Sequence, residues 1–387
     1  MFEKPACLPT IQTVYTPGRG VCEACRRACD TVRDVALREL DGPPGEPWER
    51  PLEGALDRLA VESDLLSGNP LGDPARRPLY VYRSPGVASG KADGPVASVY
   101  VIQGFSGQAD MWVGRTAFEP TMIERLDAMF AAGGCPEAIV VFVDAWTSRG
   151  GSQYLNSSST GPYLDYLCDE VVQFVDARYP THADRDRRGL AGKSSGGYGA
   201  MIHAMRYAQH WGAIADHSGD ALFECCYQRD FPVVARELRD RFEGSYDVFY
   251  RQLEQTDHFD WGRFGKPFEM YGYACAYSPD PDRPGEALLP FEIATGRLVD
   301  EIWDRWLELD PVRMAPHSAE ALRSMRRIYL DAGKSDEWFL DLGAQAFSGE
   351  LDKLGVDHTL ELFDGKHGGI TYRYPGAIRE LLLALSG

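Results

Sequence analysis

The sequence predicts an α/β protein in which a mostly parallel central sheet is flanked by helices. From residue 79 onward, short apolar or β-branched runs alternate with longer segments of helical periodicity, which is typical of a sheet covered on both faces. The length of 387 residues allows one large α/β domain with an insertion, or two domains. Ligands bind such sheets beyond the carboxyl ends of the strands. We therefore expect functional side chains directly after the predicted strands.

Seven runs are predicted as strands because they are short, apolar and rich in β-branched residues. They cover residues 79–83, 97–103, 138–144, 187–192, 212–218, 326–333 and 358–365. Helices are predicted where apolar residues recur at helical spacing, at residues 165–179, 337–355 and 374–385.

Two segments do not follow this alternation. The proline- and glycine-rich stretch "DGPPGEP" at 41–47 follows a predicted helix and indicates a linker, so residues 1–47 are predicted to form an N-terminal helical arm. Residues 220–310 contain helical segments and many aromatic residues, and about 90 residues are too many for a loop. We predict a cap or lid insertion there, which leaves the core at residues 48–219 and 311–387.

The composition excludes several kinds of partner. Acidic residues outnumber basic ones by 58 to 40, which gives a net charge of −18. Such a surface repels nucleic acid and anionic membranes, so neutral or cationic small molecules are the expected ligands. The sequence contains no apolar run long enough to span a membrane. The first twenty residues contain no apolar signal-peptide core, so we expect a cytoplasmic protein.

The nine cysteines do not indicate a disulfide framework, because their number is odd and no secretory signal is evident. Cys22, Cys25 and Cys29 could, with Cys7, supply thiolates for zinc. Their spacing also fits an amphipathic helix, and we favour the helix over a metal site. The arm could dock on the body of the protein or pair two subunits, so a homo-oligomer is a possible assembly.

The stretch "GLAGKSSGGYGA" at 189–200 contains the pattern G-x-S-x-G with Ser194 at its centre. This pattern marks a sharp turn from strand to helix that exposes a serine nucleophile. Ser195 does not fit the pattern, because Lys193 would occupy a position that requires glycine. The backbone N–H of Ser195, at the start of the next helix, is instead predicted to stabilise an oxyanion.

A serine nucleophile requires a base and an acid, which follow it in chain order as acid and then histidine. Among the eight histidines, only His367 in "FDGKHGG" follows a predicted strand and also follows the candidate acids. The candidate acids lie after the penultimate strand, and we prefer Asp336 because it lies on the turn. The other candidates are Asp331, Glu337 and Asp341.

The loop after the strand at 97–103 is expected to supply the second oxyanion donor. We predict the N–H of Phe105, with that of Ser106 as the next choice. Substrate-pocket positions are predicted from other loops that follow strands, and the aromatic insertion favours an apolar or aromatic acyl group. The predicted pocket residues are Ser106, Trp146, Tyr154 and Asp220.

Three segments, "AGKSSGGYGA", "DAGKSDEWFL" and "FDGKHGG", resemble the signature segments of an esterase family of α/β-hydrolases. That family includes S-formylglutathione hydrolase, feruloyl and enterochelin esterases and mycolyltransferases. The resemblance covers roughly residues 79–219 and 311–386. It implies the α/β-hydrolase fold and a serine carboxylester hydrolase whose triad is Ser194, Asp336 and His367. It also implies that neither a metal nor an organic cofactor is used.

The sequence therefore predicts a serine esterase for a small ester, with His367 as the base that activates Ser194 and then water. Two alternatives stay open at this point. An acceptor alcohol could replace water, which would make the protein an acyltransferase. The chain could also be a non-catalytic protein that keeps the fold and uses the arm or the insertion for binding.

Overall fold

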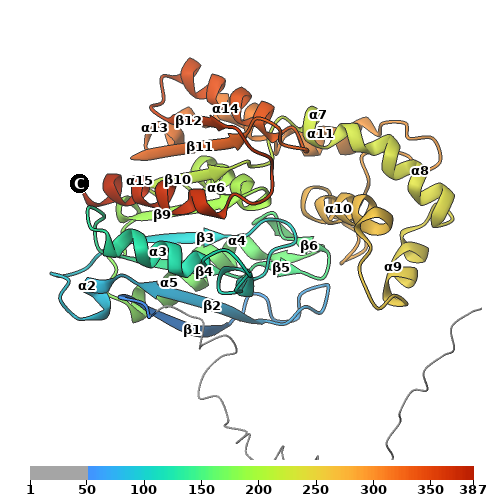
Figure 1. Cartoon of the computed structure of the whole chain (residues 1–387). Helices are drawn as coiled ribbons and strands as arrows, with labels where there is room; N and C mark the ends of the chain where they lie inside the picture. The colour runs from blue at the N-terminus through green and yellow to red at the C-terminus, as the bar shows by residue number, and fades with distance from the viewer. Residues whose placement is uncertain (1–50) are drawn as a thin grey trace, which may run out of the picture. The chain divides into compact units, whose positions relative to one another are not determined.

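An eight-stranded sheet forms the centre of the computed structural model, which describes residues 51–387 (Figure 1). The strand order is β1-β2-β4-β3-β9-β10-β11-β12. Neighbours from β4 to β12 are parallel, whereas β2 is antiparallel to both β1 and β4. This arrangement confirms the predicted mostly parallel sheet. The strands are β1 (Ala55–Glu62), β2 (Arg76–Arg83), β3 (Ala97–Ile102), β4 (Ala138–Val143), β9 (Arg188–Lys193), β10 (Ala213–His217), β11 (Arg327–Gly333) and β12 (Thr359–Phe363).

The seven predicted strands are all present, but β1 was not predicted. Its sequence, "ALDRLAVE", is only partly buried and carries charged residues. It pairs with one neighbour, β2, at the end of the strand order. An edge strand needs no continuous apolar run, because one of its sides has no neighbouring strand. The pattern that reveals buried strands therefore does not reveal this one.

Both faces of the sheet are buried under helices. Side chains alternate along β3, so Val99 and Val101 enter one core while Tyr100 and Ile102 enter the other. The helices α3 (Met122–Ala131) and α15 (Tyr374–Ser386) pack on the Val99 face. The opposite face is covered by α5 (Val172–Arg178), α6 (Ser195–Arg206) and α14 (Leu340–Leu354).

Shorter elements connect these layers. The helix predicted at 165–179 is present, but it begins as α4 (Tyr163–Asp165) and contains a π-helical turn at Tyr166–Val171 before α5. Two small ribbons, β5–β6 (Trp146–Thr147, Gly150–Gly151) and β7–β8 (Asn156–Ser157, Gly161–Pro162), follow β4. Other short helices are α2 (Pro85–Ala88), α12 (Pro311–Met314) and α13 (Ala319–Arg323). Turns of 3-10 helix occur at Ala109–Trp112, Arg185–Arg187, Gln228–Asp230, Ala315–His317 and Thr371–Arg373.

Residues 220–310 contain helices and no strand of the central sheet. Figure 1 shows the helix at Trp261–Tyr277 beside β5 and β6, which follow the carboxyl end of β4. Buried aromatic residues of this segment, including Phe249, Tyr273 and Trp306, belong to the same core cluster as Tyr100 and Ile102. The domain boundaries of the predicted cap stay a prediction. The helices are α7 (Phe223–Cys226), α8 (Phe231–Arg241), α9 (Tyr246–Glu254), α10 (Trp261–Tyr277) and α11 (Asp300–Leu307).

Several predictions concern residues 1–50, which lie outside the described part of the chain. They are the helical arm at 1–47 and the choice between helix and metal site at Cys22, Cys25 and Cys29. The cytoplasmic location belongs with them, because it was inferred from the first twenty residues. All of them stay predictions. Among residues 51–387, no helix combines the length and the apolar character that crossing a membrane requires.

Candidate active site

Ser194 occupies a strained turn between β9 and α6. Its backbone has φ 57° and ψ −124°, a conformation that is costly for any residue with a Cβ. Its N–H donates to the His217 carbonyl at 3.0 Å, and its carbonyl accepts from Tyr198 at 2.8 Å. A Cβ at Gly196 would lie 2.6 Å from the Ile102 carbonyl oxygen, so this position of the motif requires glycine. The turn has the geometry expected of a nucleophile elbow.

His367 and Asp336 form a nearly buried pair. The imidazole Nδ1 lies 2.8 Å from Asp336 Oδ2, and the two residues are 8% and 4% exposed. Asp336 Oδ1 accepts a second hydrogen bond, from the Trp338 backbone N–H at 2.9 Å. The two loops approach closely, because Ser335 N–H donates to the Gly365 carbonyl at 2.9 Å. Among the four candidate acids, Asp336 is the one whose carboxylate contacts the His367 side chain.

The other three acids have different contacts. Asp331 lies within β11 and pairs with His217 at 2.8 Å and with Arg373 at 2.6 Å. Glu337 accepts from the backbone N–H of His367 at 3.1 Å and pairs with Lys366 at 3.1 Å. Asp341 lies in the first turn of α14. The Asp331–His217 pair is a second imidazole–carboxylate pair, but both side chains are fully buried and neither lines the cavity described next.

A cavity of about 670 Å³ lies over the nucleophile turn. Ser194 and His367 both line it, so residues 173 positions apart in the sequence face the same cavity. The predicted loop after β3 contributes Phe105 and Ser106 to the same lining. The remaining lining residues are Gly104, Gly107, Gln108, Asp110, Met111, Trp112, Lys193, Trp261, Glu269, Tyr273, Trp338, Gly369, Ile370, Thr371 and Tyr374.

The segments that carry the two predicted oxyanion donors adjoin the nucleophile. A Cβ at Gly104 would lie 3.3 Å from Ser194 Cβ and 4.0 Å from its Oγ, so the loop that leads into Phe105 runs along the serine. Ser195 is the first residue of α6. In the described part of the chain, neither the Phe105 N–H nor the Ser195 N–H has a hydrogen-bond acceptor. Two unpaired donors next to a serine could accommodate a developing negative charge.

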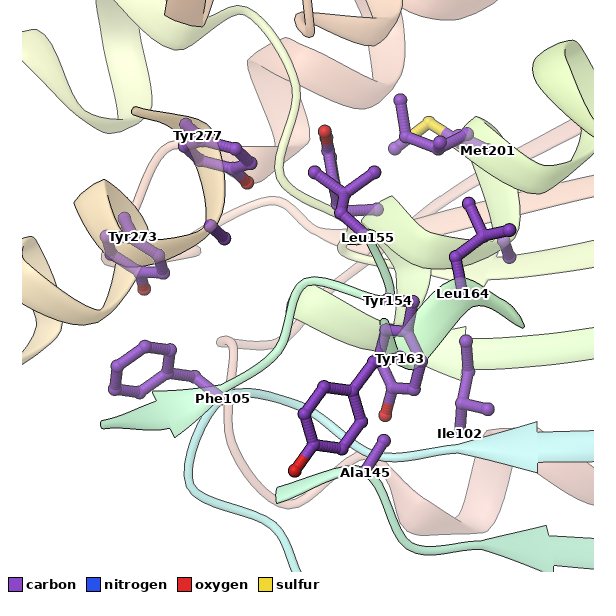
Figure 2. Close-up of a cluster of buried hydrophobic side chains, with 14 of the residues drawn as sticks. Ile102, Phe105, Ala145, Tyr154, Leu155, Tyr163, Leu164, Met201, Tyr273 and Tyr277 are labelled. Atoms are coloured by element: carbon purple, nitrogen blue, oxygen red, sulfur yellow. The ribbon is translucent and has the colours of Figure 1, made fainter. Parts of the chain in front are cut away.

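The Phe105 side chain holds this loop in place. It is 6% exposed, and its ring centroid lies 4.8 Å from that of Tyr273 and 6.0 Å from that of Phe268. Figure 2 shows Phe105 and Tyr273 in the same buried cluster, with Tyr273 on helix α10. The insertion therefore packs directly on the loop that carries a predicted oxyanion donor.

Of the four predicted pocket residues, Ser106 lines the cavity and the other three do not. Tyr154 is buried among core side chains (Figure 2), where its hydroxyl donates to the Gln103 carbonyl at 2.7 Å. The Asp220 carboxylate accepts from Tyr227 at 2.8 Å and from Gln153 at 3.2 Å. Trp146 lies in β5, where its carbonyl accepts from Arg77 at 2.6 Å. The prediction that these three residues line the pocket is therefore wrong, and their contacts are with other parts of the fold.

The cavity lining includes three charged residues that were not predicted from the sequence, Asp110, Lys193 and Glu269. Burial lowers the pKa of Lys193, while the nearby carboxylates of Asp336, Asp220 and Glu337 oppose that shift. Burial also raises the pKa of Glu269, to about 7. The sequence could have pointed to Lys193 only through its position inside the serine motif. It could have pointed to Glu269 only through its helical spacing from Trp261 and Tyr273. Within residues 51–387, no three His, Cys, Asp or Glu side chains group as a metal site would require.

Comparison with known proteins agrees with this geometry. The family model described as "Putative esterase" matches residues 89–369, more than half of the chain. Esterase Rv1288 of Mycobacterium tuberculosis is 34% identical over 80 residues, a stretch that covers 20% of this chain and only 17% of that relative.

Two solved structures have a similar fold, and each superposition covers nearly the whole of the solved chain. A ferulic acid esterase superposes with a TM-score of 0.53 at 17% identity, over 86% of this chain and 98% of its own. An S-formylglutathione hydrolase of Staphylococcus aureus superposes with a TM-score of 0.50 at 16% identity, over 86% and 99%. At these identities the likeness shows the α/β-hydrolase fold. Together with the family match, it shows that this chain belongs to the esterase family of α/β-hydrolases.

Proposed function

We propose that the protein is a serine carboxylester hydrolase that acts through an acyl-enzyme. The observation that most strongly supports this proposal is the Asp336–His367 hydrogen bond of 2.8 Å, because His367 lines the same cavity as the strained Ser194. Family membership is consistent with it, since the family is described as one of esterases. In this proposal Ser194 is the nucleophile, His367 the base and Asp336 the acid.

The proposed mechanism has two halves. In the first, His367 Nε2 takes the Ser194 hydroxyl proton while Oγ attacks the ester carbonyl, and the protonated imidazole then donates that proton to the leaving alcohol. The N–H groups of Phe105 and Ser195 stabilise the tetrahedral oxyanion, and each such donor typically contributes a rate factor of about a hundred or more. In the second half, His367 activates a water molecule that releases the acid.

The lining favours a small ester with an apolar or aromatic part. Trp112, Trp261, Tyr273 and Trp338 all contribute to the cavity, and large aromatic surfaces stabilise apolar groups removed from water. The proposed partner is therefore a small-molecule ester. Hydrolysis is proposed over acyl transfer, and adding a primary alcohol to the assay separates the two, because a transferase would form the new ester in preference to the free acid.

A fluorophosphonate probe tests the proposed nucleophile. Wild-type protein is expected to be labelled at Ser194, and Ser194→Ala to lose both labelling and turnover of 4-nitrophenyl esters, with kcat reduced about 10⁴-fold or more. Ser195→Ala is the matched comparison, because the role proposed for Ser195 uses its backbone and labelling should persist. Labelling that depends on Ser195, or folded protein that is never labelled, would contradict the proposal.

A further inference from the structure

Helix α10 directs a stripe of side chains into the cavity. Trp261, Glu269 and Tyr273 all line it, and they are separated by eight and four residues, a spacing that places them on one face of a helix. The ring of Trp261 is partly open to solvent, with 55% of the residue exposed, whereas Tyr273 is 7% exposed. The stripe thus runs from the mouth of the cavity towards its interior, with a single ionisable carboxyl group between two aromatic rings.

The carboxylate of Glu269 lacks a hydrogen-bonding partner of its own. Only 14% of its side chain is exposed, and no donor in the described part of the protein makes a hydrogen bond to it. Lys266 comes no closer than 3.9 Å, because its ammonium pairs with Asp230 at 2.6 Å. A carboxylate removed from water without a donor is destabilised. A ligand that brings a donor or a positive charge would remove that cost.

We propose that Glu269 binds a protonated amine on the substrate, so that the preferred ester carries an ammonium group on its acyl part. This inference rests on the proposed function, because it assumes that the ester is held at Ser194 in the same cavity. Tyr273, one helical turn from Glu269 and close enough to feel its charge, can add cation–π attraction. The net charge of −18 favours the approach of a cation.

The opposite charge in the cavity indicates how the substrate would lie. The carboxylates that act on Lys193 are those of Asp336, Asp220 and Glu337, all near the nucleophile turn or the Asp336 loop. The charged groups that act on Glu269 are Lys266, Asp230, Asp220 and Arg229, all within residues 220–310, and Asp220 thus acts on both groups. Lys193 ends β9 and Glu269 lies on α10, so the two charges enter the cavity from different elements. An ester placed at Ser194 has its ammonium group repelled by Lys193 and attracted towards α10.

The preference should also depend on pH. Burial raises the pKa of Glu269 to about 7, while the ammonium of Lys266 and the guanidinium of Arg229 lower it and the carboxylates of Asp230 and Asp220 raise it. Glu269 is then largely protonated near pH 6 and ionised near pH 8, whereas an alkylamine stays protonated throughout this range. The preference for an ammonium ester should therefore increase with pH. Titration of His367 acts on both kinds of ester and cancels in their ratio.

The test compares 4-nitrophenyl 6-aminohexanoate with 4-nitrophenyl heptanoate, which have acyl chains of equal length and differ in an ammonium or a methyl group at the end. The flexible chain lets the ammonium reach Glu269 from an ester held at Ser194. The quantity measured is the ratio of kcat/KM for the amino ester to that for heptanoate, after subtraction of spontaneous hydrolysis. The variants are Glu269→Gln, which keeps the shape but removes the charge, and Glu254→Gln, an exposed position on α9 that removes the same charge elsewhere.

We expect Glu269→Gln to lower this ratio about tenfold. Glu254→Gln should leave the ratio unchanged. In wild-type protein the ratio should increase about fivefold or more from pH 5 to pH 8, and this measurement decides the question even if the Glu269 variant does not fold.

A ratio that changes less than twofold in Glu269→Gln, or that is flat with pH in the wild type, would overturn the inference while leaving the esterase proposal intact. If wild-type protein hydrolyses neither ester and takes up no fluorophosphonate, the proposed function fails and this inference fails with it.

Discussion

Replacing Asp336 by asparagine tests how the proposed triad controls the histidine. The carboxylate has two defined contacts, the Trp338 backbone N–H at 2.9 Å on Oδ1 and His367 Nδ1 at 2.8 Å on Oδ2. An asparagine in the same place must direct its carbonyl oxygen to the Trp338 N–H, because two donors cannot face each other. Its NH₂ group then faces Nδ1 of His367.

This orientation has a direct consequence for the reaction. Nδ1 must now accept a hydrogen bond, so the neutral imidazole carries its proton on Nε2 and can no longer take the proton of Ser194. The loss in kcat expected for this wrong tautomer is about 10⁴-fold, which corresponds to about 5 kcal/mol in the activation barrier. Because the two side chains have nearly the same shape, the fold should be preserved.

The assay is steady-state hydrolysis of a 4-nitrophenyl ester at neutral pH, with thermal unfolding as the check on folding. Asp341→Asn is the matched control, since Asp341 was a competing acid and lies on α14. It should keep kcat within about threefold of wild type. Asp336 could not be the orienting acid if folded Asp336→Asn retained more than a tenth of wild-type kcat. The same would follow if Asp341→Asn lost as much kcat as Asp336→Asn.

Three further predictions concern stability. Gly196→Ala should destabilise the protein by about 2 kcal/mol, because the new Cβ would lie 2.6 Å from the Ile102 carbonyl oxygen and 2.8 Å from that of Gln103; an unchanged denaturant midpoint would refute this. Gly349→Ala on α14, with no atom within 4 Å of the new Cβ, should instead stabilise by about 0.5–1 kcal/mol, and a lower midpoint would contradict that. Burial disfavours the Asp331 carboxylate, but its pairing with His217 and Arg373 holds its pKa below the usual 3.8. Its contribution to stability is therefore present above about pH 4 and lost as the pH falls through that lower pKa. The free energy of unfolding in urea, measured between pH 7 and pH 3, should fall less steeply with decreasing pH in Asp331→Asn than in wild type. Equal pH dependence in the two proteins would count against the pairing.

The sequence alone predicted the features that depend on local chemistry. Buried strands such as β3 and β4 need continuous apolar runs, so their ends could be placed within about three residues. The turn at Ser194 needs small residues on both sides, which the motif contains. His367 and Asp336 could be selected because parallel strands end at one edge of the sheet, and the structure joins these two residues by a hydrogen bond of 2.8 Å.

Only the tertiary structure decided which side chains line the cavity. Tyr154 and Asp220 follow strands, as pocket residues often do, but neighbouring segments cover them and pair their polar atoms. Trp261 and Glu269 come from a helix far along the chain and line the cavity because α10 packs against the loop of Phe105. Periodicity and turn motifs record the constraints that act along a short stretch of backbone. The lining of a cavity depends on contacts between segments distant in sequence, and no local pattern records these.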